Sequence, residues 1–113
     1  MENEAVKITD TLVGTGQEAL KGALCFVHYE GFLEDGTKFD SSYDHGRPFE
    51  FVLGSNRVIK GWSQGLLGMK TGGKRTIFVP SGLGYGERQI GKFITPHSNL
   101  IFHVELLEVR PRE

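Results

Sequence analysis

The chain has 113 residues, with 13 basic and 14 acidic side chains and a single cysteine. A formal charge of -1 excludes the strongly basic surface expected of a nucleic-acid-binding protein. No apolar run approaches the ~18 residues that a membrane span requires, and the acidic N-terminus lacks the apolar core of a signal peptide. One cysteine cannot form an internal disulfide. We therefore expect a cytoplasmic protein without nucleic-acid or membrane partners, folded as a single domain over residues 1–113.

Glycine and the aromatic residues are the unusual part of the composition. There are 16 glycines, and the apolar residues include eight Phe, three Tyr and one Trp. This glycine content is about twice the usual ~7%. The composition predicts a small, mostly β domain that turns often and has an aromatic core.

Five segments have the pattern of β-strands. In chain order they are residues 5–13, 24–33, 49–53, 74–80 and 100–109. The second is at first apolar at both odd and even positions, which is typical of a strand buried on both faces. It leads into Asp35-Gly36, a hairpin-turn signal. The last segment is the longest and is the best candidate for a central strand.

Residues 58–69 have a different period. Their apolar side chains recur at steps of three and four residues and so lie on one face of a helix: Val58, Trp62, Leu66 and Met69. Gly61, Gly65 and Gly68 each weaken this helix by ~1 kcal/mol relative to alanine, so it must be short and must depend on packing against the sheet. The predicted fold class is α+β, a curved antiparallel sheet with one short helix on its concave face.

Several motifs of common enzymes are incomplete. Residues 68–75 nearly match the phosphate-binding loop G-x-x-x-x-G-K-[ST], but Arg75 replaces the hydroxyl residue, and a helix-like segment precedes the motif instead of following it. Cys25 lies in an apolar strand, as a core cysteine does. The four histidines show no metal-ligand spacing, and there is no G-x-S-x-G elbow. We expect no metal and no cofactor.

The charges are unevenly distributed. Residues 51–86 contain no acid but five bases: Arg57, Lys60, Lys70, Lys74 and Arg75. Such a run is usually a solvated surface. The alternative is a mild preference for acidic ligands or partners.

The most specific signal is a set of short segments in a fixed order. They are VHY at 27–29, LEDG at 33–36, KFDSS at 38–42, RPF at 47–49, VIKGW at 58–62, GYG at 84–86 and LIF at 100–102. In order and spacing the chain resembles the FKBP-type peptidyl-prolyl cis/trans isomerases, the immunophilins that bind tacrolimus and rapamycin. The resemblance covers about residues 5–110. Its FDSS, VIKGW and YG elements are the most specific.

The resemblance implies a five- to six-stranded antiparallel sheet that wraps one short helix, with an apolar cleft between them. It implies catalytic roles for Tyr29, Asp40, Tyr85 and Phe102. The implied substrate- and inhibitor-binding residues are Phe39, Phe49, Val58, Ile59, Trp62 and, at the rim, Ile94. Trp62 would form the floor, the Ile59 N–H and the Tyr85 hydroxyl would bind substrate carbonyls, and the Asp40 carboxylate would face the imide. Without the resemblance, the aromatic residues would be read as core packing and Asp40 as part of an Asx-type turn.

The resemblance further implies a monomeric isomerase that acts on proline-containing peptides and folding proteins, binds tacrolimus- and rapamycin-type macrolides, and forms no covalent intermediate. The alternative is a module that binds proline-containing segments or a partner protein in the same cleft with little turnover. The loop at 87–96 (ERQIGKFITP) departs from the family's glycine- and proline-rich version, because Ile90 and Phe93 are bulky and Thr95 replaces a frequent proline. Substrate preference is therefore the least transferable property.

Overall fold

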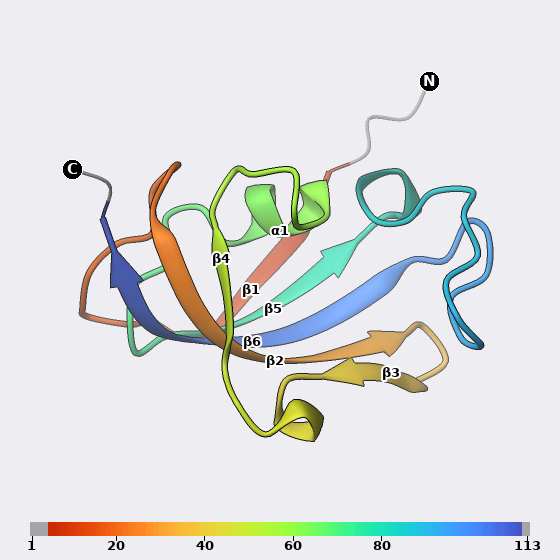
Figure 1. Cartoon of the computed structure of the whole chain (residues 1–113), viewed down its shortest axis with the longest axis horizontal. Coiled ribbons are helices and arrows are strands. Elements are labelled where there is room, and N and C mark those ends of the chain that lie inside the picture. The colour runs from red at the N-terminus through yellow and green to blue at the C-terminus, as the bar shows by residue number, and fades with distance from the viewer. Residues whose placement is uncertain (1–4, 112–113) are drawn as a thin grey trace.

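The computed structural model describes residues 5–111, which form a curved antiparallel sheet with a short helix lying against it (Figure 1). The strands are β1 (Lys7–Leu12), β2 (Leu24–Leu33), β3 (Lys38–Ser41), β4 (Phe49–Val52), β5 (Lys74–Val79) and β6 (Leu100–Arg110). The helix α1 spans Lys60–Gly65, and the 3-10 turns η1 and η2 span Tyr43–His45 and Ser81–Leu83. None of the helices in this described part is long and apolar enough to cross a membrane.

The strand order is β1-β5-β6-β2-β3, so β6 is central, as its length predicts. β2 pairs with β6 along its whole length. On its other side, β2 pairs with β4 through residues 24–27 and with β3 through residues 30–32. The chain crosses between these two partners through η1 (Figure 1). β3 and β4 therefore pair with opposite ends of the same edge of β2.

β2 is buried on one face, which differs from the two-sided burial predicted from its composition. Cys25, Val27, Tyr29 and Gly31 are buried, whereas the residues between them are half-buried. The apolar residue Phe26 and the ring of His28 therefore lie on the outer face, and the buried face carries the core. The hairpin after β2 turns at Gly36 with φ +92°, as the Asp-Gly signal predicts. β3, which follows the turn, was not predicted from the residue pattern because it has only four residues.

The helix α1 is shorter than the predicted span of residues 58–69. Ile59 is still extended, and the chain leaves the helix before Gly68, which adopts φ +82°. Two helical glycines allow α1 to lie directly on β5. A Cβ atom at Gly61 would lie 2.4 Å from Val79 Cγ1, and one at Gly65 would lie 2.8 Å from Ile77 Cγ2. Because real Cβ atoms essentially never lie this close to another atom, any larger residue at Gly61 or Gly65 would force the helix or the strand side chains to shift.

Arg75 connects three elements behind the helix. Its Nε donates to Asp10 Oδ1 on β1 at 2.7 Å, and its Nη1 donates to the carbonyl of Gly65 at the C-terminal end of α1 at 2.8 Å. A cation at this end of a helix satisfies a free carbonyl and complements the helix dipole. Arg75 is thus a structural residue at the position where a phosphate-binding loop would need a hydroxyl.

Candidate functional site

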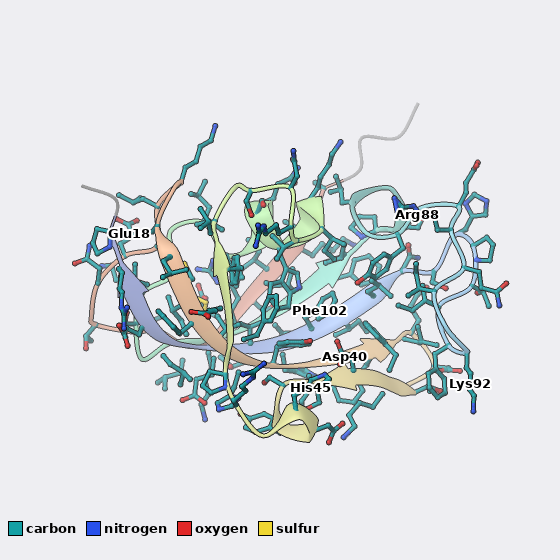
Figure 2. All side chains as sticks on the ribbon, viewed as in Figure 1. Glu18, Asp40, His45, Arg88, Lys92 and Phe102 are labelled. Carbon is teal, nitrogen blue, oxygen red and sulfur yellow. The ribbon has the colours of Figure 1, made fainter. Side chains whose placement is uncertain are left out.

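A cavity of about 770 Å³ opens between the sheet, the N-terminal end of α1 and the loop after β5. Figure 2 labels three of its lining residues: Asp40 and Phe102 lie toward the middle of the molecule, and Arg88 lies on the loop between β5 and β6. Nine of the ten site residues predicted from the resemblance line it: Tyr29, Phe39, Asp40, Phe49, Val58, Ile59, Trp62, Tyr85 and Phe102. Residues far apart in the sequence therefore converge on one hollow.

Trp62 forms the centre of an aromatic cluster in this cavity. Its ring centroid lies 4.9 Å from that of Tyr29, 5.4 Å from that of Phe102 and 5.8 Å from that of Phe49, with the rings nearly perpendicular in each pair. These edge-to-face contacts are the geometry that aromatic quadrupoles favour. Trp62 is only 4% exposed. The rings thus hold one another in place before any ligand enters.

Two N–H donors of the lining residues, one in a side chain and one in the backbone, have no acceptor within residues 5–111. The indole Nε1 of Trp62 is buried and has no hydrogen-bond acceptor among the described residues. The backbone N–H of Ile59, the residue before α1, likewise makes no hydrogen bond within residues 5–111. A buried donor without a partner costs ~1–3 kcal/mol. The Ile59 N–H is therefore available to a carbonyl of a bound peptide.

Asp40 is the acid that lines the cavity, and its carboxylate is fixed on several sides. Oδ2 accepts a 2.6 Å hydrogen bond from the Tyr29 hydroxyl, and Oδ1 accepts one of 2.8 Å from the backbone N–H of Ser41. The Nε2 of His45 lies 3.2 Å from Oδ1 (both residues are labelled in Figure 2). Burial, followed by the hydrogen bond and charge of Asp40, raises the pKa of Tyr29 above its usual range. Tyr29 therefore stays protonated and keeps donating to Asp40.

Tyr85 contributes a second hydroxyl. It follows η2 and lines the cavity half-buried. Burial first, and then the negative charge of Asp40, raise the pKa of Tyr85. Its hydroxyl remains a hydrogen-bond donor at neutral pH.

No group of three or more His, Cys, Asp or Glu side chains within residues 5–111 is arranged to hold a metal ion.

The sequence model of the FKBP-type peptidyl-prolyl cis-trans isomerases matches residues 16–107. An FK506-binding protein of Neisseria meningitidis serogroup A is 55% identical over 102 residues, covering 90% of this chain and 94% of the relative. The mouse (Mus musculus) peptidyl-prolyl cis-trans isomerase FKBP2 is 53% identical over 92 residues, covering 81% and 66%.

The chain belongs to the FKBP family. Its activity is that of a peptidyl-prolyl cis-trans isomerase, which confirms the prediction from the sequence segments.

Solved FKBP structures have the same architecture. The crystal structure of AtFKBP13 superposes with a TM-score of 0.84 at 43% identity, covering 91% of both chains. FkpA from Escherichia coli gives a TM-score of 0.85 at 39% identity, covering 94% of this chain and 48% of that one. The predicted α+β fold, a curved sheet around one short helix, is confirmed.

Ile94 is the predicted site residue that does not line this FKBP cleft. Its side chain is 3% exposed and belongs to the core. Paired backbone hydrogen bonds with Ile90, of 2.8 and 3.2 Å, hold the loop in a narrow turn that directs Ile94 inward. In this structure Ile94 is therefore a core residue, and its role at the cleft rim stays a prediction. The bulky residues that the loop exposes are Ile90 and Phe93.

The FKBP cleft also has polar walls, made by residues other than the ten predicted site residues. These residues are Ser55, Asn56, Arg57, Lys60, Ser63, Gln64 and Arg88. Arg57 and Lys60 belong to the acid-free run noted in the sequence, so a signal existed for them. Arg88 lies in the divergent loop, where neither period nor spacing assigns a residue to the cleft.

Proposed function

We propose that this FKBP-type isomerase binds X–Pro segments in the cavity described above and accelerates rotation about the prolyl bond without a covalent intermediate. The observation that carries the proposal is the convergence of six aromatic residues and one fixed carboxylate on a single hollow. The six are Tyr29, Phe39, Phe49, Trp62, Tyr85 and Phe102. Folding polypeptides with exposed X–Pro bonds are the corresponding substrates.

The chemistry follows from the nature of the amide bond. Rotation must break the resonance of the C–N bond, which sets a barrier of ~18–20 kcal/mol. The twisted transition state has lost that resonance, and its carbonyl is less polar than that of the planar amide. An aromatic cavity therefore destabilises the planar ground state more than the twisted state. Each ~1.4 kcal/mol of this difference raises the rate tenfold.

Each polar group has a proposed role. The Ile59 N–H and the Tyr85 hydroxyl donate to carbonyls that flank the proline, and so hold the peptide ends while the bond turns. Asp40 faces the carbonyl of the rotating imide, where its charge favours the twisted form. Tyr29 positions that carboxylate through its 2.6 Å hydrogen bond. Trp62 supports the prolyl ring from below, with Phe102 and Phe49 as walls.

Macrolide binding is proposed for the same cleft. Relatives of this chain are FK506-binding proteins. A cavity of about 770 Å³ with an aromatic floor has the size and lining of a drug-binding pocket. We expect both tacrolimus and rapamycin to bind and to compete with peptide substrates.

The alternative is a module that holds proline-containing segments in the cleft with little turnover. The arrangement of Asp40 and Tyr29 favours catalysis, because a simple binding cleft has no need of a carboxylate that is held in one orientation by a 2.6 Å hydrogen bond. The cytoplasmic location, the monomeric state and the assignment of residues 1–113 to one domain stay predictions.

The deciding experiment measures cis/trans exchange of a Leu-Pro tetrapeptide with and without the protein. We expect acceleration that rapamycin abolishes, together with a change in the fluorescence of Trp62, which is the only tryptophan. Rapamycin binding without acceleration would favour the binding module. Neither acceleration nor a fluorescence change would overturn both functions.

A further inference from the structure

The bases of the acid-free run separate into groups once the chain is folded. Arg57 and Lys60 line the cleft. Arg75 is bound to Asp10 and to the end of α1, and Lys74 lies by a shallow hollow on the outer face of the sheet. Lys70 lies in neither place. A run of bases that looked uniform in the sequence therefore supplies two cations to the substrate site.

A third cation faces the same cavity from another segment. Arg88 lies near the middle of the segment between β5 and β6 (Figure 2), whereas Arg57 precedes α1 and Lys60 is its first residue. All three side chains are exposed. None of them makes an ion pair or a side-chain hydrogen bond with another residue of the 5–111 region.

The negative charge at the cavity does not offset these cations. Asp40 is the acid among the described lining residues, and its oxygens are occupied by Tyr29, Ser41 and His45. Lys60 is also the first residue of α1, and the first turn carries no acid. A cation at the N-terminal end of a helix opposes the helix dipole. Lys60 therefore does not serve the stability of α1.

The positions of the cations determine what they can contact. The cleft interior is aromatic and accommodates the prolyl ring, so charged groups at its margin meet the residues that flank the proline. An extended peptide advances ~3.3–3.6 Å per residue, which brings side chains within a few residues of the proline to the rim. Complementary side chains there are carboxylates.

We propose that this isomerase prefers X–Pro segments flanked by Asp or Glu, and that Arg57, Lys60 and Arg88 determine this preference. The inference rests on the proposed function, because it concerns the same cleft. The cations contact flanking residues and not the rotating bond, so they bind ground and transition states equally. Such uniform binding lowers KM and leaves kcat unchanged.

The test uses three peptides that differ only at two flanking positions: Ac-Glu-Ala-Leu-Pro-Phe-Glu-NH2 and its Gln and Lys counterparts. Exchange is measured by NMR, because a coupling protease has charge preferences of its own. For two or three exposed ion pairs of ordinary strength, kcat/KM of the Glu peptide should exceed that of the Gln peptide roughly three- to tenfold at low salt. The gain should lie in KM, and most of it should disappear at 0.5 M NaCl.

Variants assign the effect to residues. In R57Q/K60Q/R88Q the ratio between the Glu and Gln peptides should fall to about one, whereas in the matched control K70Q it should stay at the wild-type value. In R57E/K60E the preference should reverse toward the Lys peptide, and thermal unfolding checks that each variant is folded.

Two failures are distinguishable. If none of the three peptides is accelerated, the proposed function fails. If all three peptides are accelerated equally, or if R57Q/K60Q/R88Q keeps the ratio, the preference assigned to these cations is overturned while the isomerase function stands.

Discussion

The hydroxyl of Tyr29 on β2 donates a 2.6 Å hydrogen bond to Oδ2 of Asp40 on β3. The register pairs Asp40 with Gly31, so Tyr29 reaches it diagonally across the sheet. Because Gly31 has no side chain, the ring of Phe39 can occupy the adjacent space: a Cβ at Gly31 would lie 2.6 Å from Phe39 Cζ. One strand pair thus supplies the carboxylate, its hydrogen-bond donor and a cleft wall.

Asp40→Asn should show how much of the activity depends on the negative charge of Asp40, because the variant keeps the hydrogen bond to Tyr29. The amide retains an oxygen that accepts from Tyr29 but loses the negative charge, so we expect kcat/KM to fall about tenfold with little change in melting temperature. Asp40→Val, in contrast, leaves the Tyr29 hydroxyl buried without a partner and should also cost ~1–3 kcal/mol of unfolding free energy. Peptide exchange and urea unfolding measure the two effects. Full activity in Asp40→Asn would contradict the role of the charge.

Trp62→Phe should weaken ligand binding more than it weakens the fold. Phenylalanine retains an aromatic ring in the cluster and removes an indole N–H that has no partner among the described residues. We expect rapamycin affinity to fall by about tenfold and unfolding free energy to change by less than ~1.5 kcal/mol, since the swap is close to conservative in a packed core. Trp62→Ala is the contrasting variant and should cost ~3–5 kcal/mol. Calorimetric titration and thermal unfolding provide the readouts, because the fluorescent reporter is lost.

Gly61→Ala should destabilise the protein although alanine is the better helix former. The new methyl group would lie 2.4 Å from Val79 Cγ1, so overpacking of ~1–3 kcal/mol opposes a helix gain of ~1 kcal/mol. Val79→Ala removes the obstructing methyl groups. In a double-mutant cycle by urea unfolding, Gly61→Ala should therefore cost less in the Val79→Ala background. Simple additivity of the two changes would refute the steric argument.

Arg75→Lys should lower the unfolding free energy although the positive charge is retained. Lysine lacks the planar fork that reaches Asp10 and the Gly65 carbonyl together. The Arg75 side chain is 10% exposed, so we expect a loss of ~1–3 kcal/mol in unfolding free energy. Arg57→Lys is the matched control, because that arginine is exposed and forms no ion pair within residues 5–111, so the exchange should change stability by less than ~0.5 kcal/mol. If both variants lost the same unfolding free energy, the contacts of Arg75 with Asp10 and Gly65 would not explain the loss.

Cys25 should be unreactive in the folded protein. Burial raises the pKa of its thiol from 9.0 to about 11. Thiolate formation is therefore suppressed at pH 8, and a disulfide reagent should modify Cys25 at least a hundredfold more slowly in the native than in the denatured chain.

The same shift has a consequence for alkaline stability. A raised pKa means that the folded state retains the thiol proton longer than the unfolded state does, so its contribution to stability is complete below about pH 9 and is lost as the pH rises toward 11. Cys25→Ala should make the loss of unfolding free energy between pH 8.5 and 10.5 shallower. If unfolding free energy fell equally steeply with pH in Cys25→Ala and in the wild type, Cys25 would not be the group responsible.

The sequence predicts the sheet better than it predicts the details of the site. Strands with a clear apolar period, such as β6, were located to within a residue or two, and the segments with VIKGW and FDSS were sufficient for the family. Four-residue β3 has too few side chains to show a period. The helix was predicted too long because its apolar period continues past the glycine that ends it.

The cleft was predictable where a side chain is tied to a family segment. Ile94 lies in the core because a turn between Ile90 and Ile94 in the divergent loop 87–96 directs its side chain inward. Arg88 in the same loop was missed, because a loop without a period gives no direction for its side chains. That Lys60 lines the cleft whereas Arg75 binds Asp10 and the end of α1 depends on contacts between distant elements, which residue spacing does not contain.

The central position of β6 has a consequence for synthesis of the protein. β6 lies between β5 and β2 and carries Phe102, yet it is the last strand to leave the ribosome. A growing chain that has reached residue 99 has the hairpin of β2 and β3 but nothing to join it to β5. Long-range pairing of this kind forms slowly and only when both partners are present. The cleft of this isomerase therefore cannot form until β6 has been synthesised.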